Sequence, residues 1–190
     1  SIMHTHARKI VQNFVHKHLS LIHAARRELW CATVCAVMGG HLLSLSRLAR
    51  ALMGQSTQRA ALKRVDRLMG NQRIAQEAQV VGAALLRTLC RGAQPLVIAV
   101  DWSEVAPDGV FVELRAVATC RGMGRGLTIY QQVYPEKKLG NARAERVLLK
   151  TLHEWMPAGV QVIVVTDAGF RRPWFTQVER LGWSWIGRIR

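Results

Sequence analysis

The sequence is short of acidic residues. Its 190 residues include 12 Asp and Glu against 27 Lys and Arg, so the formal net charge is +15 and the isoelectric point is about 11.1. The shortage is greatest in residues 1–94, which hold 14 basic residues and 3 acids (net +11), whereas residues 95–190 hold 13 and 9 (net +4). A basic excess of this size favours a polyanionic partner. We expect the amino-terminal half to make most of the electrostatic contact with it.

Four other features are missing, and each excludes a class of protein. No run reaches about 18 uncharged apolar residues, the length that a membrane span needs; the longest candidate, 29–45, is interrupted by Gly39, Gly40 and His41. The four cysteines are scattered, which argues against a disulfide-stapled secreted domain. No signal-peptide pattern and no Gly-x-Ser-x-Gly elbow is present. We therefore expect a reduced, cytoplasmic protein that is neither membrane-bound nor a serine hydrolase.

Apolar residues recur at helical spacing through residues 6–90. Glycine pairs and capping hydroxyls divide this region, since Gly39-Gly40 ends one helix and Ser44 or Ser46 can begin another. The clearest helices are predicted over Leu45–Leu52, Thr57–Met69 and Gln76–Leu89. A linker is expected at residues 91–95.

After Pro95 the apolar period changes from 3.6 to 2, which indicates strands. The predicted order is one strand, two hairpin strands, a helix, a strand, a helix and a strand; these cover residues 96–100, 110–119, 127–133, 142–156, 160–166, 173–181 and 183–189. An antiparallel meander followed by a crossover helix to a parallel fourth strand is the order of the ribonuclease-H-like fold. The expected fold class is α/β: a helical, helix-turn-helix-like region, then a partial ribonuclease-H-like mixed sheet with flanking helices.

Two aspartates follow runs of β-branched residues, 66 positions apart. Asp101 follows Leu96–Val100, and Asp167 follows Val160–Thr166. If the first and fourth strands are parallel neighbours, both carboxylates lie at the carboxyl edge of the sheet, where ligands of open α/β sheets bind. Carboxylate pairs suit Mg²⁺ or Mn²⁺, and a pair of such ions cleaves phosphodiesters. The alternative is that each aspartate only caps a strand or a turn.

Five segments carry a family resemblance. They are Val100–Ser103, Val165–Phe170, Lys63–Asn71, Pro173–Phe175 and Leu181–Arg190. Together they resemble bacterial insertion-sequence DDE transposases, most closely the insertion-sequence-four family of cut-and-paste enzymes. The resemblance runs from about residue 42 to the end and is densest after residue 95.

This resemblance implies a ribonuclease-H-like catalytic domain, Mg²⁺ with Mn²⁺ as a substitute, and double-stranded DNA as partner, both as terminal inverted repeats and as target. It implies strand nicking, hairpin formation and strand transfer by a homodimer on paired ends, in the bacterial cytoplasm beside the nucleoid. Asp101 and Asp167 match the first two catalytic acids. The third, a Glu in a Tyr-x2-Arg-x3-Glu-x6-Lys signature, has no match, because Glu145 precedes Asp167 and Glu179 lacks the framing residues. We therefore expect the third acid to lie beyond residue 190 and the fragment itself to be inactive.

The expected domains are a helical DNA-binding region at residues 1–93 and an incomplete catalytic domain at residues 94–190. In the first, a helix-turn-helix would place Arg59, Lys63 and Arg67 on one face of its second helix, beside Arg64, to contact DNA. The alternative is a solvated basic helix in a bundle.

Arg171 and Arg172 follow the second aspartate closely. We expect them to hold phosphates of the scissile strand; the alternative is a pair of solvated loop residues.

Two other functions remain open. One is a non-catalytic DNA-binding protein or transposition inhibitor derived from a transposase. The other is a cellular nuclease of the same fold. Mg²⁺-dependent nicking separates the enzymes from the binding protein, and a preference for element ends separates a transposase from a general nuclease.

Overall fold

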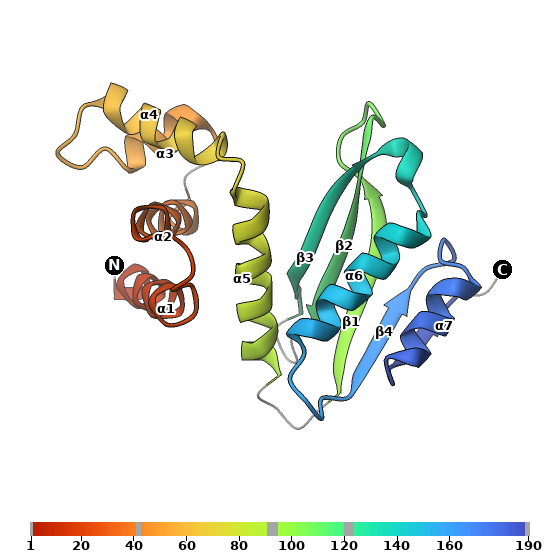
Figure 1. The fold of residues 1–190 in the computed structure, drawn as a ribbon. Coiled ribbons are helices and arrows are strands. Elements are labelled where there is room, and N and C mark those ends of the chain that lie inside the picture. The colour runs from red at the N-terminus through yellow and green to blue at the C-terminus, as the bar shows by residue number, and fades with distance from the viewer. Residues whose placement is uncertain (1, 41–42, 91–94, 120–123, 189–190) are drawn as a thin grey trace. The chain divides into compact units, whose positions relative to one another are not determined.

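The computed structural model describes residues 2–40, 43–90, 95–119 and 124–188, which form a mixed α/β structure (Figure 1). By their contacts the residues divide into two compact units, Ser1–Val81 and Gly82–Arg190. The helices are α1 (Ile2–His18), α2 (Ala24–Met38), α3 (Leu45–Ala51), α4 (Gln58–Met69), α5 (Ile74–Leu89), α6 (Ala142–Trp155) and α7 (Arg172–Arg180), with a short 3₁₀ helix at Glu136–Lys138. The strands are β1 (Leu96–Glu104), β2 (Phe111–Thr119), β3 (Gly126–Pro135), β4 (Val162–Thr166) and β5 (Ser184–Gly187).

The first unit is helical, and its best-defined pair is α3 with α4. Both helices begin at a hydroxyl cap: Ser44 accepts from the backbone N–H of Arg47, and Thr57 from that of Ala60. The two helices share a small buried cluster of Leu48, Ala49, Ala61 and Val65. This core leaves the basic side of α4 exposed to solvent.

The second unit is built on a five-stranded sheet in the order β3-β2-β1-β4-β5. Strands β1, β2 and β3 are antiparallel neighbours, whereas β4 pairs in parallel with both β1 and β5. This order confirms the expected topology, in which the first and fourth strands lie side by side.

Helices α6 and α7 lie against one face of this sheet (Figure 1). Their apolar sides bury Leu148, Leu149, Leu152, Trp174 and Val178, each no more than 2% exposed. Alternate residues of β1, Ile98 and Val100 among them, join the same core. Because successive side chains of a strand point to opposite faces, the residues between them belong to the other face.

One strand extends further than the sequence pattern indicates. The apolar run ends at Val100, which predicts the end of the strand there, but β1 continues to Glu104. The reason is pairing: β4 stops at Thr166, opposite Val100, whereas β2 continues beside β1 as far as the pair Glu104 and Val112. Asp101 is therefore a strand residue, at the point where β1 loses its parallel neighbour.

The contacts divide the chain within α5, between Val81 and Gly82. Helix α5 is continuous, and its carboxyl-terminal part joins the sheet core through Leu86. The domain boundary expected between residues 93 and 94 stays a prediction. Residues 91–94 lie outside the described residues, as do residues 121–123 of the expected hairpin turn.

Two expectations drawn from missing features concern cysteines and membrane spans. Cys31, Cys35 and Cys90, the cysteines within the described ranges, are free thiols. No helix in the described part of the chain is both long enough and apolar enough to cross a membrane.

Candidate functional site

Asp101 and Asp167 occupy neighbouring positions at the carboxyl edge of the parallel pair β1 and β4. Val100 is in register with Thr166, and each aspartate is the next residue along its strand direction. Both are exposed. The structure therefore brings together the two acids that the sequence separates by 66 residues.

The two aspartates belong to the face of the sheet opposite α6 and α7. Val100 and Trp102, on either side of Asp101, pack in the core beneath those helices, so Asp101 points the other way. Thr166 is likewise buried, and Asp167 follows it. A hydrogen bond from the loop after β4 orients the Asp167 carboxylate: the backbone N–H of Gly169 donates to Asp167 Oδ1 at 2.9 Å.

The charges of the two aspartates at this edge repel each other. Partial burial raises the pKa of the Asp101 carboxyl above its usual value, and the neighbouring charge of Asp167 raises it further. The backbone N–H of Trp102 and the guanidinium of Arg115 oppose part of this rise, and Glu113 adds to it. A cation beside the two aspartates would relieve their repulsion.

Glu113 and Arg115 extend the polar face along β2. Arg115 is the cross-strand partner of Asp101, and Glu113 that of Ser103. Glu113 is only 9% exposed; its carboxylate pairs with Arg115 at 3.3 Å and accepts hydrogen bonds from Ser103 and Gln131. These bonds hold the Glu113 carboxylate in place within the sheet, whereas the carboxylates of Asp101 and Asp167 are exposed.

The donor set fits Mg²⁺ or Mn²⁺ better than a metal that needs a complete protein cage. Within the described ranges, no cluster of three or more His, Cys, Asp or Glu side chains is arranged to hold a metal ion. Mg²⁺ commonly binds through one or two carboxylates and completes its shell with waters and substrate phosphates. The pair of Asp101 and Asp167 matches that pattern.

The structure adds a buried acid that the sequence interpretation set aside. Glu145 on α6 is 7% exposed and accepts a hydrogen bond from Trp102 Nε1 at 3.1 Å. Burial raises the pKa of the Glu145 carboxyl, while the Trp102 hydrogen bond and the charge of Arg171 lower it in part. It lies on the opposite face of the sheet from Asp101. The sequence could have predicted the burial of Glu145 from its spacing, since it shares the apolar side of α6 with Leu148 and Leu149.

Arg171 and Arg172 lie at the start of α7, a few residues beyond Asp167. Arg171 is the residue before the first turn and Arg172 begins the helix. Both are exposed. Arg172 also lines a cavity between α6 and α7. Their position beside the aspartate edge suits phosphate contacts, which stay a prediction.

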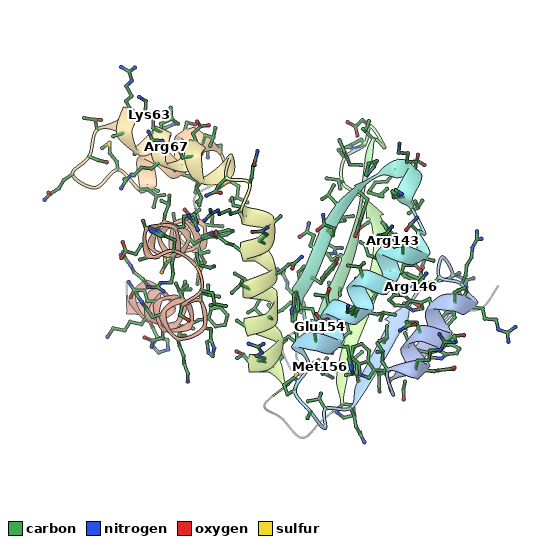
Figure 2. All side chains as sticks on the ribbon, in the orientation of Figure 1. Lys63, Arg67, Arg143, Arg146, Glu154 and Met156 are labelled. Atoms are coloured by element: carbon green, nitrogen blue, oxygen red, sulfur yellow. The ribbon has the colours of Figure 1, made fainter. Side chains whose placement is uncertain are left out.

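The predicted DNA-contacting residues of the first unit all lie on α4 and are exposed. Figure 2 labels Lys63 and Arg67 on this helix. Arg64 differs from its neighbours, because its Nη2 donates to the backbone oxygen of Leu52 at 2.6 Å and to Ser56 Oγ at 3.3 Å. Arg64 thus ties α4 to the turn after α3, whereas Arg59, Lys63 and Arg67 form no ion pair among the described side chains.

Comparison with known proteins gives distant structural neighbours. No protein-family model matches the sequence, and no curated protein matches it either. Among solved structures, the catalytic domain of Mos1 mariner transposase is similar at 17% identity with a TM-score of 0.37, over 63% of this chain and 62% of that one. The Mos1 strand transfer complex is similar at 17% identity with a TM-score of 0.34, over 86% of this chain and 58% of that one. The chain thus spans about three fifths of each neighbour, and the strand order of the sheet remains the basis of the fold assignment.

Proposed function

We propose that this chain acts in DNA transposition, with Asp101 and Asp167 as the metal-binding acids of a ribonuclease-H-like catalytic core. The observation that carries the proposal is the register of β1 with β4, which places the two aspartates side by side. The net charge of +15 supports a nucleic-acid substrate. The resemblance of the segments around both aspartates to insertion-sequence DDE transposases supports transposition over other phosphodiester chemistry.

In this proposal the residues divide the work by position. Asp101 and Asp167 would hold Mg²⁺ or Mn²⁺, which supplies a Lewis acid and an activated oxygen nucleophile for phosphodiester cleavage. Gly169 orients the Asp167 carboxylate through its backbone N–H. Arg171 and Arg172 would position the phosphates of the cleaved strand, and exposed cations of α4 would bind duplex DNA. The resemblance adds terminal inverted repeats as the specific DNA and a homodimer as the acting species.

A second candidate is a DNA-binding protein without cleavage activity, such as an inhibitor of transposition. The observation in its favour is the exposed basic face of α4 with Arg59, Lys63 and Arg67, which would bind DNA without any chemistry at the aspartate edge. The two candidates share DNA binding and differ in Mg²⁺-dependent nicking.

We expect Asp101→Asn and Asp167→Asn each to weaken Mn²⁺ binding by about tenfold or more, since even indirect supports of a metal site are worth 10–100-fold. The change removes one anionic ligand and keeps the side-chain shape. Electron paramagnetic resonance of free Mn²⁺ during titration measures the affinity. Duplex DNA binding should persist in both variants, whereas any Mg²⁺-dependent nicking should be lost.

Glu104→Gln is the matched control, because Glu104 is an exposed acid at the end of the same strand and its replacement changes the charge equally. It should bind Mn²⁺ like the unaltered protein. Equal Mn²⁺ affinity in the unaltered protein, the control and both aspartate variants would show that the edge is not a metal site.

A further inference from the structure

Helices α6 and α7, which cover one face of the sheet, line a basic groove. A cavity of about 400 Å³ opens between α6 and α7. Three of its lining residues are arginines, Arg146 from α6 and Arg172 and Arg180 from α7. All three are exposed, and none forms an ion pair with another described side chain. We call this cavity the α6/α7 groove.

The arginines of the groove form an extended row and not a single point of charge. Arg172 and Arg180 are eight residues apart on one helix, about 12 Å along its axis at 1.5 Å per residue. Thr176, midway between them, also lines the groove. Phosphates recur about every 3.4 Å of rise along a DNA strand. A row of this length can therefore contact more than one phosphate of the same strand.

The remaining lining residues fit an anionic ligand that is not deeply buried. Glu145 is the single acid among the residues lining the groove, and its carboxylate is engaged by Trp102 and partly neutralised by the charge of Arg171. Three guanidiniums against one carboxylate leave the lining with a net charge of +2. The indole N–H of Trp174, whose side chain is 2% exposed and lines the groove, has no hydrogen-bond partner among described atoms.

The position of the groove connects it to the aspartate edge. Arg172 is five residues beyond Asp167. Helix α6 leads into the amino end of β4 and α7 leaves its carboxyl end, and Figure 1 shows both helices beginning at the edge where β4 ends. The partial positive charge of two helix amino termini adds to that of the arginines there.

We propose that the α6/α7 groove binds the phosphodiester backbone of DNA that extends past the aspartate edge. Guanidiniums suit this ligand because their planar fork donates two hydrogen bonds to one phosphate. The inference rests on the proposed function, since it assigns the groove to the same DNA. It adds Arg146 and Arg180 as contacts and extends the interface onto the helix-covered face.

The test is the salt dependence of duplex DNA binding by the full chain. Fluorescence anisotropy with a labelled duplex of arbitrary sequence gives the slope of log K against log salt. Each phosphate contact contributes about 0.9 to that slope. Arg146→Ala with Arg180→Ala should therefore lower its magnitude by about 1.8. Arg146→Lys with Arg180→Lys keeps both charges and should restore most of the slope.

The matched control replaces Arg143 and Lys150, which are exposed residues of α6 outside the groove (Figure 2 labels Arg143 and Arg146). It lowers the net charge by the same two units and should leave the slope unchanged. Equal loss in the two double variants would mean that only net charge matters, and the groove assignment would be wrong. Loss of polyglutamate binding without loss of DNA binding would also overturn it, because the groove would then recognise carboxylates.

Failure of this inference is distinguishable from failure of the proposed function. If the unaltered protein does not bind DNA, both fall. If it binds DNA and the groove variant behaves like the control, the groove assignment alone fails. The circular dichroism spectrum and denaturant unfolding of the groove variant should match those of the unaltered protein, which shows that the variant is folded whether or not the aspartate edge binds metal.

Discussion

The affinity of the chain for duplex DNA is expected to fall by about 10³-fold or more when salt rises from about 50 to about 200 mM. The reason is counterion release: a protein that neutralises six to ten phosphates frees the same number of condensed cations, and added salt opposes their release. With a net charge of +15, of which +11 lies in residues 1–94, the chain has enough basic residues for contacts of that number. Anisotropy titrations at several salt concentrations measure the effect.

Replacing Arg59, Lys63 and Arg67 with alanine should account for about three units of that slope, because these exposed cations share one face of α4. Arg64 is left in place since it holds the turn after α3. A variant with Lys137, Lys138 and Lys150 replaced carries the same charge change on the second unit and should keep the slope. Binding that does not respond to salt, or equal losses in the two triple variants, would refute α4 as a DNA-contacting helix.

Gly82→Ala is expected to destabilise the protein by about 2–3 kcal/mol, the upper range for an overpacked site. Gly82 lies within α5, where helix propensity alone predicts a gain of about 1 kcal/mol for alanine. The close contact of Gly82 with β3 reverses the sign of this expected change in stability. A Cβ at this position would overlap the backbone oxygen of Ile129 and approach Trp155 Cζ3 to 3.1 Å. Backbone cannot move aside as a side chain can, so α5 would have to shift from the sheet.

Denaturant unfolding followed by circular dichroism measures this change. Gly70→Ala is the control, because Gly70 has a negative φ of −82° and an added Cβ would meet only Asp66 O at 3.4 Å, an ordinary contact. Its effect should be small. If Gly82→Ala is as stable as the unaltered protein or more stable, the close packing of α5 on β3 would be wrong.

The helices were predictable because their signals are local. Ser44, one of the two expected caps, begins α3, and the apolar spacing of α6 matches its buried side. The strand order was predictable from the change of apolar period and from the order of strands and helices along the chain, which is that of the ribonuclease-H-like fold. The end of β1 was not, because it depends on a neighbour: the strand continues past its apolar run for as long as β2 pairs with it.

The candidate site, like the fold, was predictable only in part from the sequence. Asp101 and Asp167 are predicted from strand ends and from the resemblance to DDE transposases. Which face they occupy followed only from the burial of Val100 and Thr166 and the packing of the half-buried Trp102 on the other side. Only the structure shows that the guanidinium of Arg64 reaches the Leu52 backbone, because the two residues are 12 positions apart in the sequence.

The sequence by itself determined the charge, the helical and strand periods, and the two aspartates, since each depends on residues close together in the chain or on composition. Only the tertiary structure decided that the aspartates lie on the face away from α6 and α7, that Glu145 lies on the opposite face, and that three arginines from two helices line one groove. These facts depend on side chains brought together from distant segments, and no local pattern records which face of a sheet a helix will cover.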